Sequence, residues 1–515
     1  MKEKTRTEYS LLNMLTNFSG YFLNTVAGYL CRIIFVRCLA AEYLGISGLF
    51  SNILSMLSLA ELGIGSAIGY ALYKPVAERD EDKITALVAY YKKAYQIIGI
   101  IVIMVGLSMI PFIKVIIRDI PDIPENIYVI YLMFLFNATV TYFYSYKGTL
   151  LYASQRNYVG QKIYYMTVVA QYILQVVVLL LTKNYMLYLV IQSAAVLTNN
   201  LLLSRKVDKD YPFIVNKPKT ALTRDEKKSL FVNTKALTIN KLCSTLVNNT
   251  DNIAITYFNG LITTGVASNY TLLISTLGTL IGQVFSSMTA SIGNMNAAEN
   301  DQKKYHFFEA YHLANFWVYG WAAVGIALVS TDLVRLCFGD NYVLEQSIPI
   351  VLAINFYFVG MNNAVYAYKS TLGLFRYGQY LLFFTAIINL GLDILLGIKF
   401  GVLGIFLATL FARLLTNVWF EPWMLYKHGF HKNPMIYFVE YLLYAVIWCA
   451  ILLICYHLCA LCHFAVAVNV ILKCIICSVI PNVVCWLCFH KTHKYQQMAL
   501  RIGNIFATLR LRLFG

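Results

Sequence analysis

Charged side chains are scarce in this sequence. They make up 13% of its 515 residues, whereas 59% are hydrophobic. A water-soluble fold of this size would need far more charge on its surface. The composition therefore excludes a soluble globular protein and indicates a chain whose main solvent is lipid.

The alternating apolar and polar pattern of membrane β-strands is also missing. Instead, long apolar stretches recur along the chain, and with their neutral flanks they reach the ~20 residues that span a bilayer; examples are 97–112, 128–142, 381–396 and 445–461. Spanning segments of this kind must be helical, because lipid offers the backbone no hydrogen-bonding partner. We predict an all-α, polytopic membrane protein with about fourteen transmembrane helices. The predicted spans, numbered in chain order, are approximately 10–38, 43–73, 94–114, 126–146, 158–182, 185–204, 229–257, 262–293, 307–331, 344–368, 377–398, 401–426, 435–458 and 464–489.

No small-residue cleavage site follows the basic N-terminus, so we expect the first apolar segment to be retained as a span. Most Lys and Arg residues fall on one side of the predicted spans, with both chain ends. The opposite side receives Arg37, Lys114, Arg118, Lys183, Arg335 and Lys399. Because basic residues collect in the cytoplasm, we predict a multi-pass protein of the cytoplasmic membrane with both termini cytoplasmic. The net charge of +16 then reflects topology and not nucleic-acid binding.

Five regions follow from this pattern. We predict a six-helix bundle over 1–204, a basic cytoplasmic linker over 205–228, a second six-helix bundle over 229–428, two additional spans within 429–490, and a basic amphipathic tail over 491–515.

A weak internal repeat supports two related bundles. Gly45-Ile46 matches Gly265-Val266 at an offset of about 220 residues, and Ala77-Glu78 matches Ala298-Glu299 nearby. Two pseudo-symmetric bundles enclose a cleft that can open to either side, the geometry of alternating access. This pattern predicts a transporter and no catalytic residues.

Cysteine and nucleotide motifs add no further chemistry. Three C-x-x-C pairs, Cys459/Cys462, Cys474/Cys477 and Cys485/Cys488, lie in or beside apolar segments, where we expect packing and not a metal or redox site. No Walker motif is present, so transport would be ion-coupled by Na⁺ or H⁺, driven by a lipid gradient, or passive. We expect no cofactor.

Polar residues inside the predicted spans are the candidate site. Asn24 and Arg32 share a face of span 1, and Lys241, Asn248 and Asp251 share a face of span 7. Arg32, Lys241 and Arg413, with Asn24 and Asn248, would form a cationic, substrate-binding cavity. Arg offers a planar fork of donors for a phosphate or diphosphate. Possible ion-coupling or counter-charge residues are Glu61, Asp251 and Asp393.

The alternative is that these charges only hold the bundles together, Arg32 pairing with Asp251 and Glu61 with Arg413. Two further charges, Glu440 and Lys473, are not assigned to the cavity. Glu440 falls near the inner membrane interface, where we expect it to snorkel, and Lys473 could either snorkel or pair.

The segment from Arg37 to Tyr95 contains LAELGIG at Leu59–Gly65 and KPVAE at Lys74–Glu78. It resembles the bacterial polysaccharide repeat-unit flippases of the MOP exporter superfamily, which export O-antigen and exopolysaccharide units. The likeness extends more diffusely along the chain. It implies translocation of undecaprenyl-diphosphate-linked oligosaccharides across the cytoplasmic membrane. The expected partners are then a polyprenyl-diphosphate-linked glycan, membrane lipids, and the glycosyltransferases and polymerase of the same pathway. Arg32, Lys241 and Arg413 match the family's cationic cavity by position in the spans.

Two other functions remain open. A cation-coupled multidrug exporter of the same superfamily would use Asp251 or Glu61 as its ion site, although the excess of interior cations disfavours a cationic drug. A membrane glycosyltransferase or polymerase would need its external aspartates, Asp119, Asp122, Asp332 and Asp340, to converge.

Overall fold

The computed structural model describes residues 6–57, 71–76, 78–117, 123–216, 218, 221–228, 230, 250–298, 300–374, 377–378 and 380–500. The chain divides into two compact units, Met1–Gly265 and Val266–Gly515, and each is described by itself. The described residues of both contain helices and no strands, which confirms the predicted all-α class.

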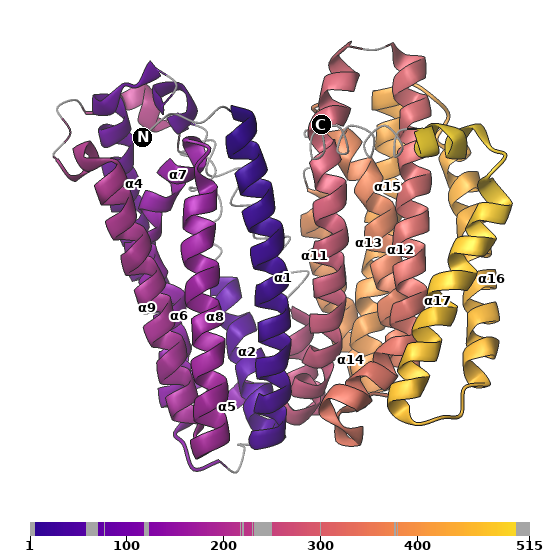
Figure 1. The fold of residues 1–515 in the computed structure, drawn as a ribbon, viewed down its shortest axis with the longest axis horizontal. Coiled ribbons are helices and arrows are strands. Elements are labelled where there is room, and N and C mark those ends of the chain that lie inside the picture. Colours follow the sequence, from indigo (N-terminus) through magenta and orange to yellow (C-terminus); the bar gives the residue numbers. More distant parts are fainter. Residues whose placement is uncertain are drawn as a thin grey trace. The chain divides into compact units, whose positions relative to one another are not determined.

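The first unit is a helical bundle (Figure 1). Its long helices are α1 (Arg6–Cys38), α2 (Ala41–Leu57), α4 (Glu81–Ser108), α6 (Ile127–Val140), α8 (Asn157–Thr182) and α9 (Tyr185–Asp210). Shorter pieces are η2 (Ile110–Phe112), α5 (Ile113–Ile116), η3 (Thr141–Phe143), η4 (Ser145–Lys147), α7 (Gly148–Ala153) and η5 (Pro212–Val215). α1 packs along α8, and α8 packs on α9.

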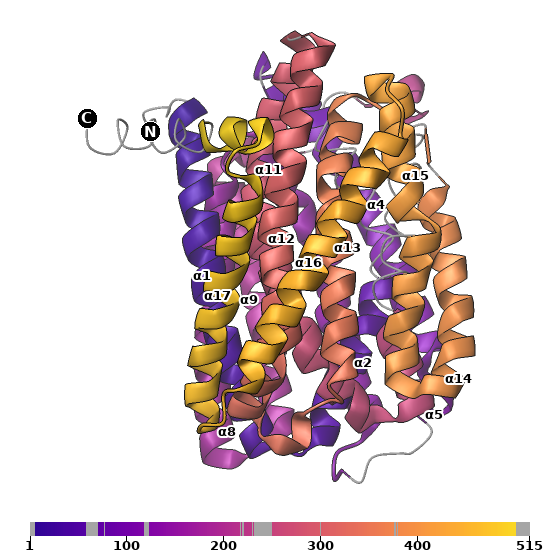
Figure 2. The ribbon, with the colours of Figure 1, turned by 90° about the vertical axis from the view of Figure 1, so that its right-hand side faces the viewer.

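The second unit contains longer helices (Figure 2). They are α11 (Leu261–Ala298), which begins before the unit boundary, α12 (Asp301–Phe338), α13 (Ser347–Thr371), α14 (Leu381–Leu415), α15 (Asn417–Met424), α16 (Met435–Ala460) and α17 (Val466–Phe489), with the short η6 (Asp340–Tyr342) and the π-helical η7 (Leu425–Phe430). α12 lies at the centre. It packs on α13 on one side and on α16 and α17 on the other, while α14 packs on α13.

Ten helices in the described part of the chain are long and apolar enough to cross a membrane. At 26 residues, α16 is about 39 Å long, more than the ~30 Å of a hydrocarbon core. Large apolar side chains cover outward faces, as with Leu181, Val439 and Leu442, which are suited to lipid. The total of fourteen spans stays a prediction, because parts of the predicted spans 43–73 and 229–257 lie outside the described residues.

Side chains cap several helices where they begin. Asp80 accepts a hydrogen bond from the backbone N–H of Lys83 at the start of α4, and Asn300 accepts one from Lys303 at the start of α12. Asn184 does the same for Leu187 in α9. Each cap satisfies one backbone donor that the first helical turn leaves without a partner.

α14 is a hairpin of two helical limbs. Its backbone breaks at Gly401, where φ is 55° and ψ is −133°. Three residues later the limbs touch so closely that a Cβ on Gly404 would lie 2.1 Å from the carbonyl oxygen of Leu396. The predicted break between spans 377–398 and 401–426 falls at this turn. The hairpin brings residues of the two limbs side by side.

Aromatic rings form much of the core of the second unit. Phe316 on α12 stacks on Tyr444 of α16 with ring centroids 4.4 Å apart, and Tyr357 on α13 stacks on Trp448 of α16 at 5.0 Å. The indole N–H of Trp448 donates to the carbonyl of Gly320, 3.0 Å away. α16 is therefore tightly packed against the bundle.

The predicted linker is docked on the first unit where the structure describes it. Lys83 of α4 forms an ion pair with Glu226, N to O 2.5 Å, which holds the pKa of Glu226 below its usual value. Arg156 pairs with Asp210 at the end of α9, 2.7 Å away. These contacts tie the connection to the ends of α4 and α8.

Candidate functional site

Three polar residues meet inside the α14 hairpin, and we call them the α14 polar cluster: Asn389, Asp393 and Thr409. Asn389 and Asp393 are four residues apart on the first limb and so share one face, while Thr409 lies on the second limb. The side-chain amide of Asn389 donates to Asp393 Oδ1 at 3.3 Å and to Thr409 Oγ1 at 3.2 Å. Their exposed fractions are 0, 1 and 5%, so the cluster is fully enclosed.

A carboxylate buried within a membrane-spanning helix is costly, and such groups usually serve a function. Carboxylate, amide and hydroxyl oxygens are the ligands that hard cations prefer. The cluster is therefore chemically suited to a small cation or to a proton on Asp393.

A second polar contact joins the limbs one turn nearer their open ends. The hydroxyl of Thr385 donates to that of Thr416 at 2.9 Å, and both residues are buried. This contact and the Asn389–Thr409 bond fix the register of the two limbs. The hairpin thus holds its oxygen atoms in place.

Arg413 lies one turn beyond Thr409 on the second limb. Its guanidinium donates weakly, at 3.4 Å, to both the backbone carbonyl and the side-chain oxygen of Asn355 on α13. Asn355 is fixed in turn by donating to the carbonyl of Phe406 at 3.0 Å. Two of the sequence-predicted residues, Asp393 and Arg413, therefore lie on facing limbs of the same hairpin.

In the first unit, Arg32 lies on α1 among phenol rings. It is partly buried and within electrostatic range of Tyr29 and Tyr188. Gly28, one turn earlier, allows the ring of Tyr172 on α8 to approach, since a Cβ there would lie 3.3 Å from its hydroxyl. Small residues of this kind let membrane helices pack closely.

Asn24, on the same stretch of α1, carries a buried side-chain oxygen that accepts no hydrogen bond within the described structure. A buried acceptor of this kind normally has a partner, so the position is suited to a polar ligand group or water. Asn24 and Arg32 are thus a pair of polar groups, eight residues apart on one helix, that face the interior of a largely apolar bundle.

Three predicted residues, Glu61, Lys241 and Asn248, lie outside the described residues. Asp251 is described and partly buried, in a helical segment of the first unit. The predicted cationic cavity combines residues of both units, so it stays a prediction. The alternative pairings of Arg32 with Asp251 and of Glu61 with Arg413 likewise stay predictions.

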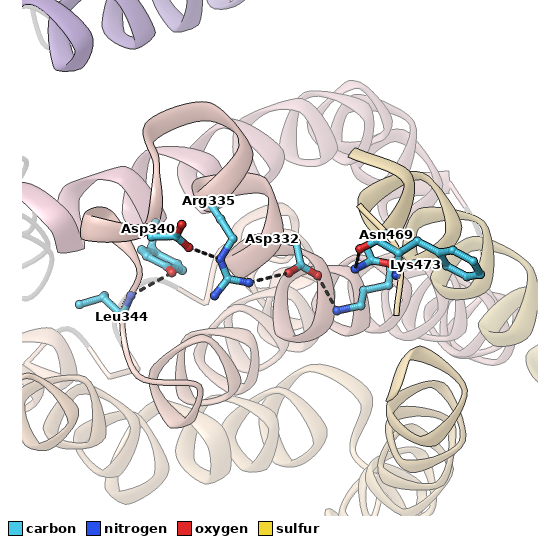
Figure 3. A network of polar contacts seen from close by, with 8 residues as sticks. Asp332, Arg335, Asp340, Leu344, Asn469 and Lys473 are labelled. Carbon is cyan, nitrogen blue, oxygen red and sulfur yellow. Dashed lines mark hydrogen bonds and ion pairs between the residues drawn. The ribbon is translucent and has the colours of Figure 1, made fainter. Parts of the chain in front are cut away.

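The two aspartates of the second unit that the sequence predicts to be external are engaged in ion pairs (Figure 3). Asp332 accepts from Arg335 at 3.4 Å and from Lys473 of α17 at 2.5 Å, and Asp340 accepts from Arg335 at 2.7 Å. Lys473 therefore pairs and does not snorkel. Asp119 and Asp122 lie outside the described residues. The two described carboxylates neutralise cations and are not arranged as a catalytic pair, which disfavours the glycosyltransferase hypothesis.

Sequence reasoning missed Asn389, Thr409 and Asn355. The four-residue spacing of Asn389 and Asp393 within an apolar span was a usable signal, because it places both on one helix face. Thr409 could not be found in this way, since its contact depends on how the limbs pack.

No protein-family model and no curated protein matches the amino-acid sequence. Among solved structures, the fold is similar to that of the lipid II flippase MurJ in an inward closed conformation, with a TM-score of 0.64, 13% identity, and coverage of 94% of this chain and 99% of that one.

Two further similarities come from the same superfamily. An inward-facing MATE multidrug resistance transporter matches with a TM-score of 0.57, 15% identity, and coverage of 81% of this chain and 99% of that one. A MOP superfamily transporter from Pyrococcus furiosus matches with a TM-score of 0.54, 14% identity, and coverage of 84% and 100%. At these identities the comparisons establish the fold. The chain shares the fold of these three transporters.

Proposed function

We propose that the protein is a flippase that moves polyprenyl-diphosphate-linked oligosaccharides across the cytoplasmic membrane by alternating access. The observation that carries the proposal is the similarity to the lipid II flippase over 94% of the chain. The MATE similarity covers less of the chain, 81% of it.

The interior cations support the same substrate class. Arg32 and Arg413 each lie within a predicted span and are at least partly buried. Arginine binds phosphate oxygens through two parallel N–H donors, so a diphosphate is a ligand group that suits such positions. In this proposal Arg32, Lys241 and Arg413 bind the diphosphate, with Asn24 and Asn248 as neutral donors.

The α14 polar cluster supports cation coupling. Asp393, with Asn389 and Thr409, would hold Na⁺ or H⁺, and Asp251 and Glu61 are further candidates in the other part of the chain. A cation that binds Asp393 more tightly in one transporter state than in the other would shift the equilibrium toward that state.

The test measures the accumulation of lipid-linked repeat units on the inner leaflet of cells that depend on this protein. Arg32→Ala and Arg413→Ala should cause accumulation at normal protein abundance. Lys399→Ala is the matched control, because Lys399 is an exposed cation near the tip of the α14 hairpin. Normal export in both arginine variants would contradict the proposal and favour the second candidate, a multidrug exporter, for which the MATE similarity and Asp393 are the supporting observations.

A further inference from the structure

A buried ion pair joins α13 to α15 in the second unit. The ammonium of Lys369 donates to Glu421 Oε1 at 2.8 Å, and the two residues are 8 and 7% exposed. The other carboxylate oxygen, Oε2, is also buried and accepts no hydrogen bond from the described residues. A pair that only held two helices together would be expected to satisfy both oxygens, because a buried acceptor without a partner is costly. Glu421 therefore has an oxygen available for a second ligand.

Polar side chains connect this pair to the α14 polar cluster. On the first limb of the hairpin, Thr385 lies one turn before Asn389, whose amide bonds to Asp393. The hydroxyl oxygen of Thr385 lies 3.4 Å from Asn417 Oδ1, and Glu421 follows Asn417 by one turn of α15. The way from Asp393 to Glu421 thus consists of two polar contacts and two steps of a single helical turn, ~5.4 Å each. We call these five residues the α14–α15 polar track.

Neighbouring contacts hold this track in place. α13, α14 and α15 pack on one another (Figure 2). The side-chain amide of Asn362 on α13 lies 3.5 Å from the backbone carbonyl of Asn417. Asn362 precedes Lys369 by seven residues, or two helical turns, so both lie on the face of α13 that packs on α15. α13 therefore contacts the track both at Asn417 and at Glu421.

The track ends on the side of the membrane that the sequence assigns to the cytoplasm. Lys369 is the first residue of the connection between the predicted spans 344–368 and 377–398, and the distribution of basic residues places this connection in the cytoplasm. The turn at Gly401 lies at the opposite end of the hairpin. A cation that moves between Asp393 and the cytoplasm needs polar groups along its way, because an apolar interior excludes charge.

We propose that Glu421 is an exchange site for the cation that binds at Asp393. This inference rests on the cation coupling proposed above. A cation that leaves Asp393 moves along the α14–α15 polar track, binds Glu421, and displaces the ammonium of Lys369 before it reaches the cytoplasm. One cation replaces another at the carboxylate, so Glu421 is never left buried without a counter-charge. The flexible lysine side chain can move aside and return when the cation has left.

The experiment follows cation exchange on the purified full-length protein. Release of radioactive Na⁺ into unlabelled NaCl reports on Na⁺, and proton uptake after a pH jump, measured with a pH-sensitive dye, reports on H⁺. The exchange that Asp393→Asn abolishes is the one that occurs at Asp393. Glu421→Gln should slow this exchange by about tenfold or more, because the path loses a charged ligand. The equilibrium affinity should stay close to that of the wild-type protein, because Asp393 and its partners are unchanged.

A second variant separates the lost ligand from lost stability. Glu421→Gln leaves Lys369 buried without its counter-charge, whereas Lys369→Gln/Glu421→Gln removes both charges of the pair. The double variant should exchange as slowly as Glu421→Gln. Lys494→Gln is the matched control, because it breaks an ion pair with Glu440 in the same unit and outside the track. It should exchange at the wild-type rate. Size-exclusion chromatography of each variant reports whether it is folded.

Wild-type exchange rates in Glu421→Gln or in the double variant would overturn the proposal. The absence of any exchange that depends on Asp393 would overturn it too. None of these measurements contains a lipid-linked substrate. A protein that exchanges cations as expected but flips no lipid-linked oligosaccharide would therefore contradict the flippase function and not the role of Glu421.

Discussion

The side-chain amide of Asn389 lies 3.2 Å from the hydroxyl oxygen of Thr409, and this bond joins the two limbs of the α14 hairpin. Both residues are buried, and the same amide also donates to Asp393. The position of the Asp393 carboxylate therefore depends on the packing of both limbs. The proposed cation site therefore forms only when the two limbs of the hairpin are packed together.

Asp393→Asn should abolish stabilisation of the protein by its coupling cation while keeping the fold. The substitution removes the charge and preserves the shape of the side chain, and a cation that binds the folded state raises its melting temperature by mass action. The measurement is the melting temperature of the purified protein with NaCl and with choline chloride, at two pH values to separate Na⁺ from H⁺.

Asp340→Asn is the control, because Asp340 is an exposed carboxylate of the same unit that pairs with Arg335 outside the hairpin. It should keep the response of the wild-type protein. An equal Na⁺ or pH response in Asp393→Asn and the wild-type protein would contradict a coupling role for Asp393.

Gly404→Ala should destabilise the protein by about 1–3 kcal/mol or more, because the added Cβ would overlap a backbone oxygen that has no room to move. That oxygen belongs to Leu396 and would lie 2.1 Å away. Gly391→Ala in the same helix is the matched control, since nothing lies within 4 Å of its Cβ position. It should be neutral or stabilising by about 0.5–1 kcal/mol. Equal melting temperatures for the two variants would show that the limbs are not so closely packed.

Lys494→Gln should weaken the attachment of the segment that follows α17. Lys494 lies 2.7 Å from Glu440 and 3.2 Å from Glu309, and its loss would leave two largely buried carboxylates without their ammonium partner. We expect a loss of about 1–3 kcal/mol, reduced from the value for a fully buried pair because Lys494 is partly exposed. Lys491→Gln, at an exposed lysine one turn earlier, should have little effect on the melting temperature.

The pH dependence of this contribution follows from the pKa of Lys494. Burial alone would lower this pKa, but Glu440 and Glu309 more than offset it and raise the pKa above its ordinary value. A raised pKa in the folded state means that the stabilisation is complete below the unfolded pKa of about 10.4 and is lost as pH rises through the folded value. The difference in melting temperature between wild type and Lys494→Gln should therefore persist through neutral pH and shrink only in strong alkali. A difference that vanishes between about pH 7 and 9 would contradict the ion pair.

Much of the fold could be predicted from apolar length and from charges inside apolar segments. The spans expected at 435–458 and 464–489 correspond to α16 and α17, because each is a continuous apolar run of sufficient length. Asp393 and Arg413 were identified as candidate site residues because a charge within an apolar run is costly and so indicates a function.

Contacts between helices could not be predicted in the same way. Asn389 and Thr409 carry no charge, and their significance depends on the turn at Gly401. The expectation that Glu440 snorkels was wrong, because Glu440 forms an ion pair with Lys494. That partner lies 54 residues further along the chain, so local residue spacing could not reveal it.

The most direct test of the central claim is a flipping assay with the purified protein in liposomes. Undecaprenyl-diphosphate-linked oligosaccharide is placed in one leaflet, and its arrival in the other is measured by the accessibility of its sugar to an enzyme that cannot cross the bilayer. A cationic dye supplies the drug-export comparison. We expect lipid-linked oligosaccharide to flip only when the protein is present, with flipping strongly reduced in Arg413→Ala and retained in Lys399→Ala. Transport of the dye with no flipping of the lipid-linked oligosaccharide would contradict it.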